Sequence, residues 1–208
     1  MTGRCFFLMR RLLAVALLLA VAAVSLPVLF LSFSVDRNIA EDSETDLTAG
    51  PQVKLLISQS GQVIRLPLEQ YLVGVVAAEM PVAFPLEALK AQAVAARTYT
   101  LRRIGIRPAG DNSHPQGDIC TDHNHCQAWI DKGEMQKRWG KSYDENYRKI
   151  LVAVAQTTGQ AIYYNNALID PVYHSTSNGR TENSEDVWGT KVPYLRSVAS
   201  GWDSASRW

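Results

Sequence analysis

Hydrophobic and polar positions divide the chain after residue 50 into short extended segments and longer helical ones. Residues 53–57 and 62–66 are rich in aliphatic side chains and flank Ser60-Gly61, a dipeptide typical of tight turns. The pattern predicts two short strands joined by a turn.

Two apolar helices follow, each opened by a proline. Pro67 begins a predicted helix that runs to about Met80, and Pro85 begins a second one that runs to about Ile104. Proline suits a first helical turn because the N–H that it lacks would have no intrahelical partner there. The second helix is rich in alanine, so neighbouring helices can approach it closely.

The next segment, residues 105–141, holds many Gly, Asp, His and Cys residues and shows little periodicity. A loop of this length is usually functional or held by a metal. A capping-box sequence, Ser142-Tyr143-Asp144-Glu145, then predicts a helix that runs to about Thr157, with Gly159 as its C-cap.

The last part of the chain predicts a hairpin and a loop. Residues 161–164 and 167–173 flank Asn165-Asn166, which favours a two-residue hairpin turn. Residues 175–186 predict a polar loop.

Together these elements predict an α+β fold, with a single domain over residues 53–208 in which helices pack on short antiparallel strands. The 208 residues suffice for one domain with a core, and 47% hydrophobic and 20% charged residues are ordinary for a globular protein. Residues 35–52 are largely polar and acidic and predict a tether in front of the domain.

The N-terminal region carries an uninterrupted apolar stretch. No charged residue occurs from Leu12 to Leu31, and about twenty apolar residues span a bilayer. We therefore expect a single-pass protein of the cell membrane, anchored by a transmembrane helix over 12–34. Arg4, Arg10 and Arg11 precede this stretch, and positively charged residues favour the cytoplasmic side of a membrane helix. We therefore expect residues 1–11 in the cytoplasm and the domain outside it. A cleaved signal peptide is the alternative, but Ser32-Phe33-Ser34 is a poor cleavage site.

The net charge of +1 hides an asymmetry between the two ends of the chain. Arg4, Arg10 and Arg11 precede the first acidic residue, Asp36, and without them 18 basic and 20 acidic side chains remain. This balance provides no basic face of the kind that nucleic-acid-binding domains need, so we expect no nucleic-acid partner.

A single carboxyl stands at the end of the first helix. Glu79 follows an apolar run and precedes Met80-Pro81, and a lone acid in apolar surroundings is a typical general acid or base. Lys90 and Arg97 lie on one face of the second helix, two turns apart, and are placed to hold a polar substrate. A structural salt bridge between Glu79 and Arg97 is the alternative, and spacing alone slightly favours it.

The long loop contains His114, Cys120, His123, His125 and Cys126. Thiolate and imidazole are ligands that zinc prefers, although the spacing is not that of a standard zinc finger. A Cys120–Cys126 disulfide is equally consistent with the sequence, because an extracytoplasmic domain permits one.

A row of polar side chains, Tyr173-His174-Ser175-Thr176-Ser177-Asn178-Gly179, follows the predicted hairpin. A catalytic pair of His174 and Ser175 is disfavoured, because neighbouring side chains of an extended segment point in opposite directions. A turn that caps backbone groups is one interpretation. The wall of a sugar-binding groove is another, to which Tyr173, His174, Ser175 and Thr176 would contribute. Aromatic side chains available to stack on sugars are Trp188, Tyr194 and Trp202.

Four separated motifs occur in a fixed order: Glu79-Met80-Pro81, residues 85–99, residues 173–177 and residues 182–189. Together they closely resemble the stage II sporulation protein D family, over about residues 51–203. The predicted N-terminal anchor fits this resemblance.

The resemblance implies a peptidoglycan lytic transglycosylase. Such an enzyme cleaves the bond between N-acetylmuramic acid and N-acetylglucosamine and leaves a 1,6-anhydro end. The implied substrate is a glycan strand already stripped of stem peptides by a partner amidase. The implied setting is septal-wall remodelling during engulfment in sporulation, together with membrane proteins of the engulfment machinery.

The resemblance also assigns roles to residues. It implies that Glu79 is the catalytic acid and that Lys90, Arg97 and Tyr173 support activity or substrate binding. One carboxyl suffices where ordinary glycosidases use two. It first protonates the leaving oxygen and then takes the proton of the muramic acid 6-hydroxyl. Family members usually extend beyond Trp202-Asp203, so we expect a chain shortened at its C-terminus.

Some members of the family bind zinc through one histidine and two cysteines. The resemblance therefore favours a structural Zn²⁺ at His114, Cys120 and Cys126 over the disulfide. The fourth ligand would be water, His123 or His125.

Two other functions stay open. The second hypothesis is a non-catalytic wall-binding activator of an N-acetylmuramoyl-L-alanine amidase, because relatives of this domain enhance amidases. The third is a zinc-dependent hydrolase that uses the His/Cys loop.

Overall fold

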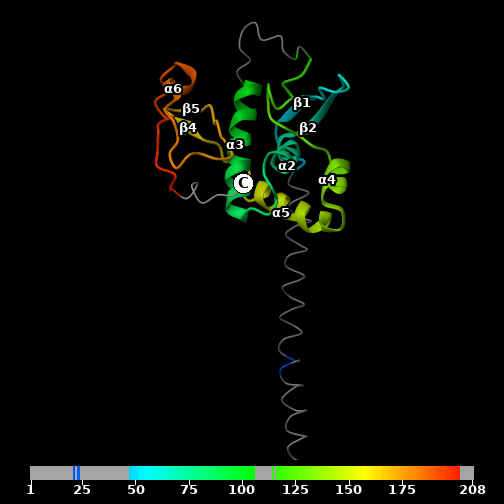
Figure 1. Ribbon diagram of the computed structural model, residues 1–208. Coiled ribbons are helices and arrows are strands. Elements are labelled where there is room, and N and C mark those ends of the chain that lie inside the picture. The colour runs from blue at the N-terminus through cyan, green and yellow to red at the C-terminus, as the bar shows by residue number, and fades with distance from the viewer. Residues whose placement is uncertain (1–20, 22, 24–46, 106–113, 115, 202–208) are drawn as a thin grey trace, which may run out of the picture.

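The computed structural model describes residues 21, 23, 47–105, 114 and 116–201 (Figure 1). Within these residues helices and strands are mixed, which confirms the predicted α+β character. No helix among them is both long enough and apolar enough to cross a membrane. The predicted anchor over 12–34 lies outside the described residues except for Val21 and Ala23.

The two predicted strands form, as β1 (Gln52–Leu56) and β2 (Val63–Pro67), and they pair antiparallel. Gly61 occupies the turn between them with a φ of 71°, a conformation that favours glycine. A third strand, β3 (Ile119–Cys120), pairs parallel to β1. The expectation of antiparallel strands alone was therefore incomplete, because β3 is too short to leave a periodic signal and forms only by pairing with β1.

Three helices build the core beside this sheet: α2 (Leu68–Glu79), α3 (Leu86–Gly105) and α5 (Tyr143–Ala155). All three contact one another, and Figure 1 shows α3 running between the β1–β2 sheet and the C-terminal segments. Ala93 and Ala96 of α3 are fully buried, so small side chains do let the helices approach closely, as the sequence predicted.

Besides β3, three further elements were not expected. The predicted loop over 105–141 contains α4 (Lys132–Trp139), whose N-cap Asp131 accepts a hydrogen bond from Glu134 N at 2.7 Å. A 3₁₀ turn, η1 (Gly140–Ser142), leads directly into α5, and Ser142 makes no side-chain cap. The predicted capping box was therefore wrong. The predicted loop over 175–186 contains the start of α6 (Ser184–Trp188).

The predicted hairpin forms but is short. Strands β4 (Tyr163–Tyr164) and β5 (Ala167–Leu168) pair antiparallel around Asn165 and Asn166, which have φ values of 48° and 62°. Two successive positive φ values are the geometry of a type I′ turn. In Figure 1 this hairpin and α6 lie on the side of α3 that faces away from β1 and β2.

Gly74 of α2 allows the segment after the His/Cys loop to pack against the helix. A Cβ atom at this position would lie 2.1 Å from Trp129 Nε1 and 2.8 Å from the Ile130 carbonyl oxygen. The Ile130 N–H donates to the Gly74 carbonyl at 3.3 Å. Close contact of this kind is possible only without a side chain.

We therefore expect Gly74→Ala to lower the free energy of unfolding by about 1–3 kcal/mol, because Trp129 must move. Urea denaturation measures this loss. The matched control is Gly61→Ala at the open β1–β2 turn, where steric crowding is absent and only the positive φ is strained. A Gly74→Ala protein as stable as the wild type would show that Trp129 is free to move away.

Candidate active site

Glu79 is the last residue of α2, and its half-buried carboxyl is held by a segment distant in the sequence. The Ala128 N–H donates to Glu79 Oε1 at 2.7 Å. Lys149 of α5 donates from Nζ to the carbonyls of Val82 at 2.7 Å and Phe84 at 2.6 Å. The hydrogen bond from Ala128 therefore holds the Glu79 carboxyl, and the two hydrogen bonds from Lys149 hold the turn that follows Glu79.

Tyr173 brings a second polar group to this carboxyl. The side chains of Gln127, Glu79 and Gln92 all influence the pKa of its hydroxyl. Partial burial raises the pKa of Tyr173 to about 12, and the Glu79 carboxylate adds to the rise. The phenol therefore stays protonated across the neutral range, although 42% of the residue is exposed. A neutral phenol beside a carboxyl can donate a hydrogen bond to it.

Tyr173 also lines a pocket of about 460 Å³. Its wall also includes Arg180, Trp188 and Arg196. The pocket therefore lies among segments between Val172 and Arg196, with Tyr173 and residues of α6 in its wall.

The motif at residues 182–189 fixes the wall of this pocket. Ser184 Oγ donates to the Thr190 carbonyl at 2.9 Å and accepts from Val192 N at 2.7 Å. Glu185 forms an ion pair with Arg196, whose hydrogen bonds lower the pKa of Glu185 to about 2. The contacts of Ser184 and Glu185 are therefore structural, whereas Glu182 of the same motif is part of the pocket lining.

Some residues of the polar row after the hairpin line the pocket and others do not. His174 and Thr176 line it together with Tyr173, whereas Ser175 is not part of the lining. A nucleophilic Ser175 activated by His174 therefore gains no support.

The aromatic candidates for sugar stacking also differ in their surroundings. Trp188 is 58% exposed in the pocket wall and is free to stack on a ligand. Tyr194 lies against Tyr164, with 5.3 Å between ring centroids, and its hydroxyl accepts from Asp170 N at 2.9 Å. Trp202 lies outside the described residues.

Arg97 lies in the core, which differs from its expected place beside substrate. The residue is 1% exposed, and its guanidinium donates to both carboxylate oxygens of Glu69, from Nε at 2.9 Å and from Nη2 at 2.6 Å. It also donates to the Gln160 carbonyl at 3.1 Å. The ion pair that spacing suggested does exist for Arg97, but with Glu69 rather than Glu79.

Lys90 lies nearer the surface, with 22% of its side chain exposed. Its Nζ donates to Glu87 at 2.7 Å within the first turns of α3. Lys90 and Arg97 therefore occupy different environments despite their shared helix face.

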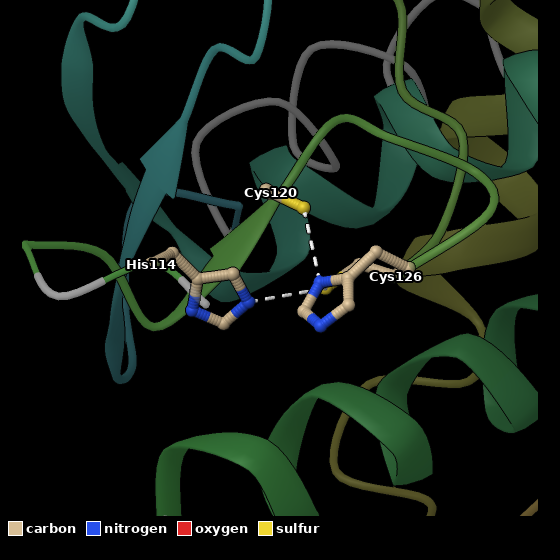
Figure 2. Close-up of side chains that lie close together, drawn as sticks. His114, Cys120 and Cys126 are labelled. Carbon is tan, nitrogen blue, oxygen red and sulfur yellow. Dashed lines mark hydrogen bonds between the residues drawn. The ribbon is translucent and has the colours of Figure 1, made fainter. Parts of the chain in front are cut away.

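The structure brings His114, Cys120 and Cys126 together, as Figure 2 shows, and adds His125 to them. The potential ligand atoms of these four residues all lie within 4.8 Å of one another. Cys120 is placed by the pairing of β3 with β1. His125 and Cys126 follow a turn in which both of their N–H groups bond the Asp122 carbonyl.

The distances in this cluster fit a tetrahedral metal better than a disulfide. Cys120 and Cys126 are free thiols in the described part of the chain. Their sulfurs lie 3.5 and 3.4 Å from His125 Nδ1, and Cys126 Sγ lies 3.4 Å from His114 Nε2. Two ligand atoms of one tetrahedral zinc, a sulfur and a nitrogen, lie roughly 3.5 Å apart.

Gln92 and Gln127 were missed by sequence reasoning. Gln92 lies in the second turn of α3 between Ala91 and Ala93, where a polar residue among alanines was a usable signal. Gln127 follows Cys126 in a stretch without periodicity, so no signal marked it. His125 was one of three options for a fourth ligand, and only the fold selects it over His123.

Comparison with known proteins identifies the family. The model of the stage II sporulation protein family (SpoIID) matches residues 58–164. Stage II sporulation protein D of Bacillus subtilis (strain 168) is 41% identical over 174 residues, which cover 83% of this chain and 50% of that protein. The protein of the same name from Bacillus amyloliquefaciens is 43% identical over 166 residues, which cover 79% of this chain and 47% of that protein.

An amidase enhancer of Bacillus subtilis (strain 168) is 38% identical over 122 residues, which cover 59% of this chain and 14% of that protein. The chain thus spans about half the length of the two sporulation proteins that it matches. The region that the family model matches contains Glu79 and the helices α2 and α3. The chain belongs to the stage II sporulation protein (SpoIID) family.

Proposed function

We propose that this chain is a lytic transglycosylase that cleaves peptide-stripped peptidoglycan strands between N-acetylmuramic acid and N-acetylglucosamine. The observation that carries the proposal is the half-buried Glu79 carboxyl, which is held by the Ala128 N–H and raises the pKa of Tyr173, a residue that lines an open pocket. Such a group is placed as a general acid and base beside a cleft that suits a glycan.

The reaction needs only this carboxyl. Glu79 gives its proton to the leaving O4 of N-acetylglucosamine while the bond from that oxygen to C1 of N-acetylmuramic acid breaks. The 6-hydroxyl oxygen of the same muramic acid bonds to C1, and its proton passes to Glu79. The carboxyl is thereby restored, a 1,6-anhydro ring forms, and no water is consumed. Tyr173 keeps the carboxyl oriented in both steps.

Product analysis tests the proposal. We expect mass spectrometry of peptide-free glycan strands treated with the protein to show 1,6-anhydro ends. Fragments with ordinary reducing ends would instead indicate hydrolysis by water and would contradict the single-carboxyl reaction.

The similarity to an amidase enhancer supports a second candidate, a non-catalytic activator of an N-acetylmuramoyl-L-alanine amidase. Its pocket would hold glycan without cleaving it. An activator would raise amidase turnover on intact sacculi and release no anhydro product from stripped strands. The same preparation can be assayed both ways.

We further propose that a structural Zn²⁺ joins His114, Cys120, His125 and Cys126. Two thiolates and two imidazoles complete a tetrahedral set, so zinc would supply a crosslink and no open position for water. Cys126 lies two residues before Ala128, and the crosslink would thus hold the N–H that orients Glu79.

Zinc binding predicts different results for two neighbouring histidines. We expect about one zinc per chain by mass-spectrometric metal analysis, and a loss of bound zinc after His125→Ala. His123→Ala is the matched control, because His123 is exposed and outside the cluster. Equal zinc loss from both variants would contradict the four-residue site. Chelation that stops cleavage while the fold survives would favour the zinc-dependent hydrolase instead.

Membership of a sporulation protein family supports a proposal for the setting. We propose an extracytoplasmic domain anchored in the cell membrane that acts on the septal wall during engulfment. Its partners would be an amidase that strips the strands and membrane proteins of the engulfment machinery.

A further inference from the structure

The pocket that Tyr173 lines has two arginines in its wall, and their surroundings differ. Arg196 donates two hydrogen bonds to the Glu185 carboxylate, from Nη1 to Oε1 at 2.7 Å and from Nη2 to Oε2, so its charge is balanced inside the fold. Arg180 forms no ion pair with any residue that the structure describes. Its positive charge is therefore left for a ligand of the pocket.

Contacts with the segment around Ser197 hold Arg180 in place. The backbone of Arg180 forms an antiparallel bridge with Ala199, and its Nε donates to Ser197 Oγ at 2.8 Å. Ser197 Oγ donates its own hydrogen to the Thr181 carbonyl at 2.6 Å, so it meets Arg180 as an acceptor. Only Nε is used in these contacts, and the two terminal nitrogens keep their hydrogens for a ligand. A guanidinium held in this way loses less conformational entropy on binding than a mobile one.

The other residues of the wall limit what this ligand is. Glu182 lines the same pocket and is exposed, so the wall carries both signs of charge and disfavours a polyanion. Trp188 supplies an aromatic side chain that is 58% exposed. The two terminal nitrogens of a guanidinium match the two oxygens of a carboxylate, and an aromatic ring suits the apolar face of a sugar. The wall therefore fits a sugar that carries a single carboxylate.

Removal of a stem peptide creates such a sugar. The stem peptide is joined to muramic acid by an amide bond at the lactyl carboxyl, and an N-acetylmuramoyl-L-alanine amidase hydrolyses that bond. Each stripped muramic acid then carries a free lactyl carboxylate. An unstripped one carries a neutral amide at the same position, in which one oxygen is replaced by an N–H group.

We propose that Arg180 is a specificity-determining residue that recognises the lactyl carboxylate of stripped muramic acid. Its terminal nitrogens donate one hydrogen bond to each carboxylate oxygen, while the sugar lies against Trp188. A stem peptide removes the charge and one of the two acceptors. This inference rests on the proposed transglycosylase function and deepens it, because it gives the preference for stripped strands a physical cause.

The disaccharide GlcNAc-β-1,4-MurNAc tests recognition without cleavage, because it lacks the MurNAc–GlcNAc bond that the proposed reaction breaks. Conversion of its lactyl carboxylate to the primary amide keeps the shape and removes the charge. In NMR titrations we expect the wild type to bind the carboxylate about fivefold more tightly than the amide. Arg180→Gln should bind both with equal affinity. A wild type without this preference would overturn the proposal.

Two further variants control for charge and folding. Arg148→Gln changes an exposed arginine of α5 outside the pocket and should keep the wild-type preference. Arg180→Lys keeps the charge but not the paired donors, and should lose most of the preference. It replaces Arg180→Gln if that protein does not fold. The full wild-type preference in Arg180→Lys would overturn the paired contact.

Free lactate separates recognition of muramic acid from general anion binding. We expect lactate not to displace the disaccharide when both are present at equal concentration, because it lacks the sugar that lies against Trp188. Displacement by lactate would make Arg180 a general anion site and would overturn the assignment to muramic acid.

Cleavage assays distinguish failure of this inference from failure of the reaction. On stripped strands, Arg180→Gln should lower kcat/KM for anhydro-product release about fivefold, and on lactyl-amidated strands it should change nothing. If the wild type binds the carboxylate preferentially but releases no anhydro ends, the reaction is wrong and the recognition stands. If it releases anhydro ends equally from both kinds of strand, the reaction stands and the recognition is overturned.

Discussion

Glu79→Gln is expected to lower the rate of anhydro-product release at least about a hundredfold. The amide keeps the shape of the carboxyl and still offers an oxygen to the Ala128 N–H, which donates at 2.7 Å in the wild type. It cannot, however, donate a proton to the leaving oxygen or accept one from the 6-hydroxyl. The measurement is the quantity of 1,6-anhydro ends released from peptide-free strands over time.

Glu87→Gln is the control for this change. Glu87 is a glutamate in the first turn of α3, is 79% exposed in its side chain and forms an ion pair with Lys90. Glu87→Gln should leave both the release of anhydro ends and the stability of the fold unchanged. If Glu79→Gln retained full cleavage, the catalytic assignment would fail. If it abolished amidase activation as well, Glu79 would act in glycan binding rather than in chemistry.

Arg97→Met is expected to lower the free energy of unfolding by about 3–5 kcal/mol. The change leaves the Glu69 carboxylate, whose side chain is 7% exposed, without its two hydrogen bonds from the guanidinium. Removing one partner of a buried pair costs more than removing both, because the remaining charge stays out of water. Urea denaturation of the variant and the wild type measures the loss.

Two control variants complete this test, one that removes both partners of the buried ion pair and one that breaks an exposed ion pair. Arg97→Met combined with Glu69→Leu should recover part of the stability, because no isolated charge remains. Lys90→Met breaks only the exposed pair with Glu87 and should change stability by less than about 1 kcal/mol. An Arg97→Met protein that is as stable as the wild type but no longer binds glycan would restore the substrate-binding role.

Local signals in the sequence predicted much of the fold. Both strands around Gly61, the helices that follow Pro67 and Pro85, and the asparagine turn of the hairpin appear where the pattern placed them. Each depends on neighbours a few residues apart, namely a proline at a helix start, a residue with positive φ or an apolar run. The family motifs singled out Glu79 for the same reason, since the motif is contiguous.

Contacts between distant segments decided the rest. Arg97 pairs with Glu69 across 28 positions of sequence, Ala128 holds Glu79 across 49, and the pairing of β3 with β1 places Cys120. Helical spacing put Lys90 and Arg97 on one face but could not say that α2 and α5 would cover only Arg97. The sequence by itself determined which residue types were available for acid chemistry and metal binding. Only the tertiary structure decided which of them meet, because burial and hydrogen-bond partners arise when elements pack together.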